Sequence, residues 1–336
     1  YRKQIQTEMG KSVIQVPRDR EGEFEPIVVP KHQSRGLSIE RLVISLYAKG
    51  MSVADIESEM QEIYGINLST SAISIITNKV SQAATEWQNR PLDSLYMIVW
   101  MDGIVFKVRE NGKVINKTVY LCVGLNKEGL KEVLGMWIGK NESAAFWMGV
   151  LTDLKARGVE DILITVTDNL NGFTETIKSV FPASTTQICV VHQIRNSCRY
   201  VVWKEKKEFT ADLKNIYNAP TKEAAEMELD NFEQKWGAKY PYAIRSWRNN
   251  WEELTVFFDF PVEIRKIIYT TNLIENLNGK IRKYTKNKLS FPNDDALKKS
   301  VYLAINEIEK KWYQPIWNWA LIFNQFITIF ENRIQV

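Results

Sequence analysis

The chain has 336 residues, of which 45% are hydrophobic and 25% are charged, and its formal net charge is +4. These values are typical of a folded protein with about two or three domains, and they exclude an intrinsically disordered chain. No apolar run reaches the roughly 20 residues that span a bilayer, so we expect no membrane partner. The three cysteines form an odd set, which favours reduced thiols and a cytoplasmic setting.

The first 36 residues are expected to form a β-like N-terminal segment. Apolar runs at 13–17 and 27–30 are typical of short strands, and the charged stretch between them is typical of a turn. This segment carries no residue pattern that indicates chemistry.

Residues 37–82 follow a helical period and predict three short helices. Ser52 and Ser69 stand where helix N-caps are expected, and a glycine-containing turn precedes the last helix. Such a unit resembles a helix-turn-helix, in which Ser71, Ser74 and Asn78 would face DNA. A plain three-helix packing unit explains the same pattern. The exposed face lacks arginine, which weakens the indication of DNA binding.

Two apolar runs each deliver an aspartate. Residues 96–101 lead into Asp102, and residues 162–167 lead into Asp168. Both runs are typical of strands buried on both faces. We therefore expect two strands that end at one rim of a sheet, where the two carboxylates converge. A single strand-end aspartate is more often only a turn cap.

The order of elements after residue 94 predicts a mixed sheet of the ribonuclease-H-like type. Three strands that include a hairpin come first, and strands alternating with crossover helices follow. A strand is expected at 186–191. We expect the catalytic domain to comprise 95–195 and 258–312, interrupted by an all-helical insertion at 196–257 and followed by a tail at 313–336.

Two-metal phosphodiester chemistry needs acidic oxygen ligands that hold the ions about 4 Å apart. Asp102 and Asp168 suit this task as strand-end ligands. Glu275, on a helix that follows the insertion, fits as the third acid. Spacing alone does not distinguish Glu275 from a solvated glutamate on a helix surface.

Three long motifs make the assignment more specific. They read VTDNLNGF at 166–173, QICVVHQIRN at 187–196 and IYTTNLIE at 268–275. In these motifs the chain resembles the Mutator-like transposases of bacterial insertion sequences, a D-D-E family. The resemblance implies that Asp102, Asp168 and Glu275 are the catalytic residues and the metal ligands, that the cofactor is Mg²⁺ with Mn²⁺ as a substitute, and that the chain forms a homodimer.

Cys189 and His192 stand three residues apart directly after the last predicted strand. No second cysteine or histidine pair follows, so a closed zinc site cannot be assembled from them. We interpret them as a buried thiol and a hydrogen-bonded histidine that shape the site.

Two basic runs suit contacts with DNA phosphates. The first follows Glu275 without an intervening acid, and the second follows the Cys-His pair. Solvated helix faces would explain both runs, and Trp247 and Trp251 beside arginines suit either base stacking or packing. The candidate DNA-binding residues of these runs are Lys280, Arg282, Lys283, Lys286 and Lys288, with Arg195 and Arg199.

The leading hypothesis is a DNA transposase that cleaves the ends of its element and joins the 3′-hydroxyl ends to target DNA. Two alternatives stay open. One is a non-transposing nuclease of the same fold, and the other is a DNA-binding regulator without catalysis. Intact acids at all three positions argue against the regulator.

Overall fold

The computed structural model describes residues 2–7, 10–15, 37–168, 170, 172–269 and 272–334. The predicted strand at 27–30 lies outside these residues. The chain forms two units: one contains the described part of 1–87 with 107–115 and 279–307, and the other contains 88–106, the described part of 116–278, and 308–334. No helix in the described ranges has the length and apolarity needed to cross a membrane.

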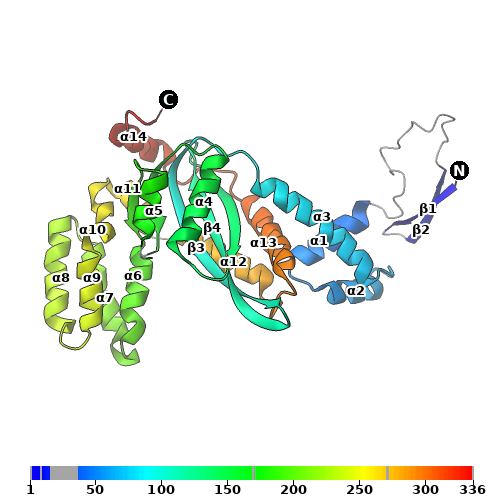
Figure 1. Ribbon diagram of the computed structural model, residues 1–336, viewed down its shortest axis with the longest axis horizontal. Coiled ribbons are helices and arrows are strands. Elements are labelled where there is room, and N and C mark those ends of the chain that lie inside the picture. Colours follow the sequence, from blue (N-terminus) through cyan, green and yellow to red (C-terminus); the bar gives the residue numbers. More distant parts are fainter. Residues whose placement is uncertain are drawn as a thin grey trace. The chain divides into compact units, whose positions relative to one another are not determined.

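The larger unit is built around a five-stranded mixed sheet with the order β5-β4-β3-β6-β7 (Figure 1). β4 pairs with β5 in the antiparallel sense, whereas β6 pairs with both β3 and β7 in the parallel sense. This arrangement of a hairpin and crossover strands agrees with the predicted mixed sheet. The strands are β3 (Leu95–Glu110), β4 (Lys113–Leu125), β5 (Lys131–Gly139), β6 (Asp161–Thr167) and β7 (Thr185–Ile188).

Two strand boundaries differ from the prediction. β3 continues for eight residues beyond Asp102, because residues after Gly103 alternate between buried and exposed as a half-buried strand does. Asp102 therefore lies inside a strand, and the predicted strand end at this residue is wrong. The predicted strand at 186–191 ends at Ile188, and Val190 already belongs to the helix α6 (Val190–Ser197).

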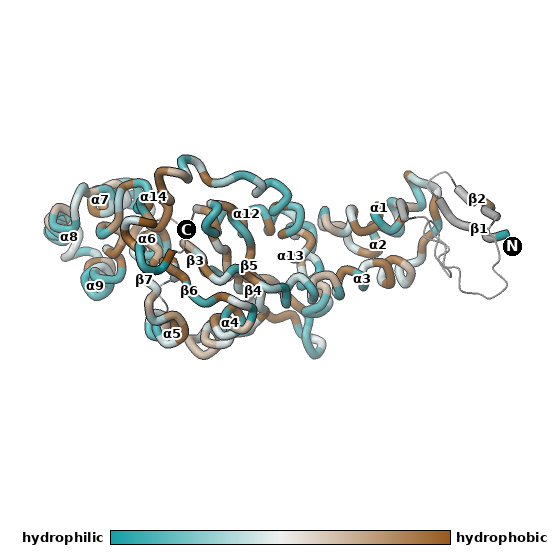
Figure 2. The backbone as a smooth tube through the Cα atoms, turned by 90° about the horizontal axis from the view of Figure 1, so that it is seen from above, coloured by the Kyte–Doolittle hydropathy of each residue, from teal (hydrophilic) through white to brown (hydrophobic). Residues whose placement is uncertain are grey.

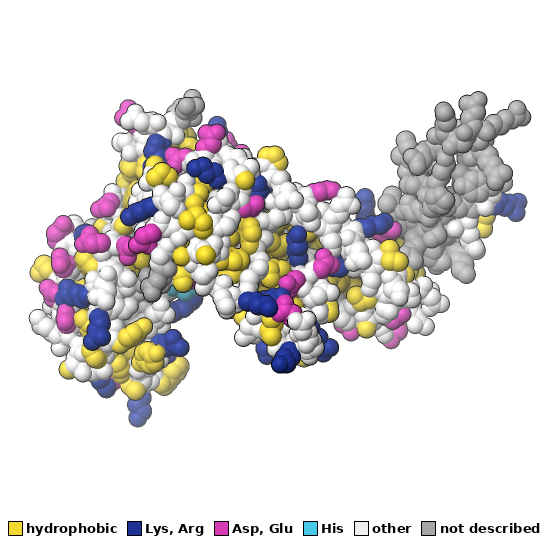
Figure 3. Space-filling view, viewed as in Figure 1, with side chains coloured by type: hydrophobic (Ala, Val, Ile, Leu, Met, Phe, Trp, Pro, Cys, Tyr) yellow, Lys and Arg dark blue, Asp and Glu magenta, His cyan; other side chains and the backbone are white. Residues whose placement is uncertain are grey.

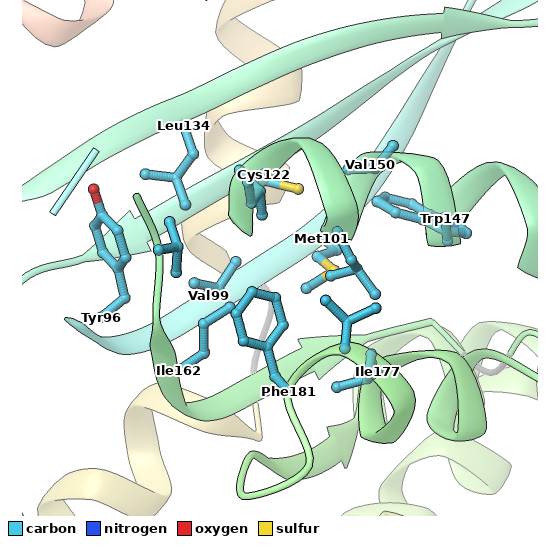
Figure 4. Close-up of a cluster of buried hydrophobic side chains, with 14 of the residues drawn as sticks. Tyr96, Val99, Met101, Cys122, Leu134, Trp147, Val150, Ile162, Ile177 and Phe181 are labelled. Carbon is cyan, nitrogen blue, oxygen red and sulfur yellow. The ribbon is translucent and has the colours of Figure 1, made fainter. Parts of the chain in front are cut away.

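One face of the sheet is covered by α4 (Ala144–Ala156) and α5 (Phe173–Val180). Figure 4 shows how side chains of β3 and of these helices interdigitate, among them Val99, Met101 and Trp147. Trp147 stacks on Phe173 with ring centroids 4.7 Å apart. Burial of these large apolar side chains supplies most of the favourable free energy of folding in this unit.

A run of helices separates β7 from α12 (Asn272–Thr285), whose first half lies on the other face of the sheet (Figures 1 and 2). Trp247 and Trp251 are buried within this run, so they pack in its interior and offer no surface for bases. The predicted tail contains a helix, α14 (Trp319–Ile329), which is hydrophobic in Figure 2, whereas α8 and α9 are largely hydrophilic. The helices of the run are α6, α7 (Lys206–Tyr217), α8 (Lys222–Trp236), α9 (Pro241–Asn249), α10 (Trp251–Leu254) and α11 (Val262–Ile268).

The other unit contains the three predicted helices, α1 (Leu37–Ala48), α2 (Val53–Glu62) and α3 (Thr70–Gln88). Ser52 caps α2 through a reciprocal pair of hydrogen bonds with Asp55, as predicted for an N-cap. The unit also holds α13 (Asp294–Glu309) and a two-stranded antiparallel sheet of β1 (Arg2–Thr7) and β2 (Gly10–Gln15).

A groove of about 630 Å³ runs along α3 in this unit. Ser74 and Asn78 line one wall, and the segment 287–293 forms the other. The Asn78 side-chain oxygen accepts a hydrogen bond of 3.0 Å from Lys299 of α13. Part of the helix face predicted to read DNA therefore contacts another segment of the same unit, with Ser74 half-buried, although Ser71 and Asn78 are exposed.

Lys288 is half-buried in this groove rather than extended into solvent. Its Nζ lies 3.8 Å from the centroid of the Tyr47 ring and 2.9 Å from the Ser300 hydroxyl. Burial, with a smaller effect of Lys299, lowers the pKa of Lys288 to about 8. The folded state therefore disfavours the charged ammonium more than the unfolded state does.

Replacing this lysine by methionine should stabilise the protein at pH 7. Because the folded pKa lies below the unfolded one, wild-type stability rises with pH between about 8 and 10.4. The Lys288→Met variant lacks this dependence, so its advantage of about 3 kcal/mol at pH 7 should shrink toward pH 10. Thermal unfolding at a series of pH values measures the effect. A constant difference between the two proteins across this range would contradict it.

Candidate active site

The pairing of β3 with β6 places two aspartates side by side. Trp100 of β3 is the register partner of Val166 of β6. Asp102 and Asp168 each follow two residues later, so they stand at the same level on adjacent parallel strands, which lie about 4.8 Å apart. Both carboxylates therefore project from the same side of the sheet at the point where β6 ends.

Asp102 is buried, with 7% of its surface exposed, and receives two neutral donors. The Gly103 N–H donates to its Oδ1 at 2.7 Å, and the Asn278 amide donates to its Oδ2 at 2.6 Å. Burial, the negative charge of Asp168 and a smaller effect of Glu275 raise the pKa of Asp102 to about 7. Asp168 and Glu275 thus both act electrostatically on Asp102.

The register of β6 with β7 also explains the position of the Cys-His pair. Thr167 pairs with Ile188, and the Thr167 carbonyl accepts a hydrogen bond from the Cys189 N–H at 2.8 Å. The helix α6 starts immediately afterwards, with the Cys189 thiol accepting from the His192 N–H at 3.4 Å. This short connection brings the first turn of α6 beside Asp168.

His192 forms an ion pair with Asp168, with 2.5 Å between Nδ1 and Oδ1. Burial opposes a charge on this imidazole, but the bonds to Asp168 and Cys189 outweigh burial and raise the pKa of His192 to about 11. The three ligand atoms of Asp168, Cys189 and His192 lie within 4.8 Å of one another. The aspartate therefore supplies a third metal-binding atom that the spacing of the Cys-His pair did not indicate.

The helix α12 lies on the face of the sheet opposite α4 and α5, where it contacts Asp102. Glu275 and Asn278 are three residues apart, so they share one face of the helix. Asn278 bonds Asp102, while Glu275 forms an ion pair of 2.8 Å with Arg195 of α6. One turn of α12 is thus tied both to β3 and to α6, which fixes the third acid beside the two aspartates.

Sequence reasoning missed three contributors to this site. Glu142, which precedes α4, accepts a hydrogen bond of 2.9 Å from the Trp147 indole. Burial and the charge of Asp168 raise the pKa of Glu142, whereas the bond from Trp147 opposes this. Asn278 and the pairing of Arg195 with an acid were also missed. Only Asn278 had a local signal, namely its position one turn after Glu275.

The donor set suits a hard divalent cation. The buried Asp102 carboxylate accepts hydrogen bonds from an amide and from a backbone N–H, and the charges of Asp168 and Glu275 act on it. Carboxylate oxygens are the ligands that Mg²⁺ and Mn²⁺ prefer. Asp102, Asp168 and Glu275 are therefore the residues that could hold such ions.

The predicted DNA-binding residues lie in different settings. Arg195 forms an ion pair with Glu275 and therefore lies at the site. The Arg199 guanidinium lies 5.6 Å from the ring centroid of Tyr200. Lys280 is half-buried. The exposed members of the first run are Arg282, Lys283 and Lys286, the first two of them in the last turn of α12.

Comparison with known proteins finds transposases both in the family match and among the bacterial relatives. The family described as "Transposase, Mutator family" matches residues 1–315. The transposase for insertion sequence element ISRM3 of Rhizobium meliloti is 42% identical over 333 residues, which are 99% of this chain and 83% of that protein. The transposase for insertion sequence element IS905 of Lactococcus lactis is 32% identical over 316 residues, 94% of this chain and 80% of that protein.

Among solved structures, the chain is similar to that of a simian T-cell lymphotropic virus intasome in complex with PP2A regulatory subunit B56 gamma. The match covers 59% of this chain and 67% of that one, at 14% identity and a TM-score of 0.21, which is too low to support an argument. The chain belongs to the Mutator family of transposases.

Proposed function

We propose that this transposase is a D-D-E enzyme, which cleaves the ends of its element and joins the freed 3′-hydroxyls to target DNA. The observation that carries the proposal is the placement of Asp102 and Asp168 at the same level of adjacent strands, with α12, which carries Glu275, hydrogen-bonded to Asp102 through Asn278. The mixed sheet order supports a ribonuclease-H-like catalytic domain over 95–195 and 258–312, with the helical run between as its insertion.

Asp102 and Asp168 would bind both metal ions, and Glu275 would complete one of the two sites. Mg²⁺ held by these residues, or Mn²⁺ in its place, would supply the Lewis acidity that activates an attacking water or 3′-hydroxyl and stabilises charge on the leaving oxygen. The carboxylates repel one another in the partly buried site, so binding of a divalent cation relieves their repulsion.

The neighbouring side chains are positioning residues. Asn278 fixes the orientation of the Asp102 carboxylate, and Arg195 holds Glu275 against α6. His192 holds the carboxylate of Asp168 through its Nδ1. Ligands that are fixed before the metal and the DNA arrive cost less free energy to order during the reaction.

DNA recognition would involve the basic end of α12 and the three-helix segment at 37–82. Arg282, Lys283 and Lys286 suit phosphate contacts, which position DNA without reading its sequence. Lys280, Arg199 and, on the three-helix segment, Ser71 remain further candidates. Two element ends must be brought together, so we also propose that the enzyme works as a homodimer in the bacterial cytoplasm.

Replacing Asp102 by asparagine should abolish strand cleavage and leave DNA binding unchanged. The buried carboxyl already disfavours its charge, so the neutral amide should be tolerated by the fold while the metal ligand is lost. Cleavage of a labelled element end in Mg²⁺ and circular dichroism measure the two effects. Glu226→Gln, an exposed change on α8, is the control and should keep full activity.

Strand transfer separates a transposase from a nuclease of the same fold. A labelled duplex that ends in the pre-cleaved 3′-hydroxyl of the element should be joined covalently to a target plasmid, and Glu275→Gln should abolish this product. Cleavage without any joined product would favour the nuclease. Absence of both products with Mg²⁺ and with Mn²⁺, despite DNA binding, would favour the non-catalytic regulator.

Neutralising the basic end of α12 should weaken binding to all duplex sequences by a similar factor. The Arg282→Ala, Lys283→Ala, Lys286→Ala triple variant should lower the slope of log K against log salt by about 2 to 3, because each lost phosphate contact removes about 0.9. Fluorescence anisotropy over a salt series measures this slope. Loss of affinity for the element end alone, with an unchanged slope, would contradict phosphate contact.

A further inference from the structure

Large aromatic side chains are exposed at one end of the helical run. Trp203 is 86% exposed, Tyr200 is 63% exposed and Tyr242 is 54% exposed. Trp203 begins the short helix η2 (Trp203–Glu205), Tyr200 ends η1 (Cys198–Tyr200), and Tyr242 lies in the first turn of α9. We call Tyr200, Trp203 and Tyr242 the aromatic patch. Figure 3 shows hydrophobic side chains bordered by lysine and arginine at the lower end of this helical run.

The backbone beneath the aromatic patch is held in place. Val201 is buried, and the Val202 N–H donates to the Tyr240 hydroxyl at 3.3 Å. The Glu205 N–H donates to the Val202 carbonyl at 3.0 Å. The rings of Tyr200 and Tyr242 meet edge to face, with centroids 5.4 Å apart. The exposed rings therefore project from a fixed support and have lost part of their freedom in advance.

The charge around the aromatic patch is positive. Arg199, Lys204 and Lys207 are exposed, and among the residues that the structure describes none of them forms an ion pair with a carboxylate. The nearby acids are neutralised, because Glu205 pairs with Lys239 and Glu208 pairs with Lys235. A ligand of this surface should thus combine flat apolar faces with negative charge.

We propose that the aromatic patch binds unpaired bases of single-stranded DNA, with Trp203 as the main stacking platform. Every base offers a flat face to an aromatic ring, and the surrounding cations match the phosphates that link the bases. In a duplex these faces are covered by neighbouring bases, so the patch should prefer frayed or single-stranded segments. The inference rests on the proposed action on DNA. It gives the protein an additional DNA contact, which is separate from the three acids.

The test compares binding of two labelled DNA probes by the full chain without divalent metal. The probes are an oligothymidylate of about 20 nucleotides and a duplex of about 20 base pairs, each longer than one stacking site. Trp203→Ala should weaken binding of the single strand about tenfold and change duplex binding less than about twofold. Trp203→Phe should retain most of the affinity, since a phenyl ring still stacks.

Two controls keep the result interpretable. Trp317→Ala removes an indole that is 89% exposed outside the helical run, and it should leave both affinities unchanged. Asp102→Asn should also bind the single strand normally, so failure of the proposed chemistry and failure of the patch are distinguishable.

Three outcomes would overturn the proposal. Single-strand affinity could be unchanged in Trp203→Ala, or both affinities could fall by the same factor, which would indicate general damage or phosphate contact alone. The third is a change in oligomeric mass by light scattering with unchanged DNA binding, which would identify the aromatic patch as an interface between copies of the chain.

Discussion

The structure of the site depends on the register between two parallel strands. Because Trp100 pairs with Val166, Asp102 and Asp168 stand next to each other, Asp102 buried and Asp168 half-buried. At an effective dielectric constant of about 20, two charges about 5 Å apart repel by roughly 3 kcal/mol. The raised pKa of Asp102 expresses this cost together with burial. A shift of one residue in the register would turn one carboxylate to the opposite face and remove the site.

The two helices beside this pair of aspartates provide different hydrogen-bond partners. α6 supplies His192 to Asp168, whereas α12 supplies a neutral amide to Asp102. The site therefore compensates only part of its negative charge with its own side chains. Such an arrangement is unfavourable for stability alone, and under the proposed function a bound divalent cation would offset the remaining negative charge.

Local sequence patterns were sufficient to select the two aspartates as candidates, but not the other residues of the candidate site. Each aspartate follows a long apolar run, and such runs predict buried strands whatever the tertiary structure. Glu275 has no comparable local signal, because a helical glutamate beside basic residues is usually solvated, and only the family resemblance selected it. Lys288 shows the converse limit: it follows a basic run in sequence, yet it packs over Tyr47 because of contacts that no local pattern encodes. Exposure is equally non-local, since the regularly spaced Trp247 and Trp251 are buried while the isolated Trp203 is exposed.

The connectivity of the site links the helical run to the acids. The chain leaves the sheet through α6, which carries His192 and Arg195, and it returns through α12, which carries Glu275 and Asn278. The ion pair between Arg195 and Glu275 joins the departing helix to the returning one. A displacement of α6 by DNA bound on the helical run would therefore act directly on the position of the third acid, whereas the two aspartates are fixed by the sheet. The strand register thus fixes the two aspartates, whereas the position of Glu275 depends on the contacts of α6 and α12.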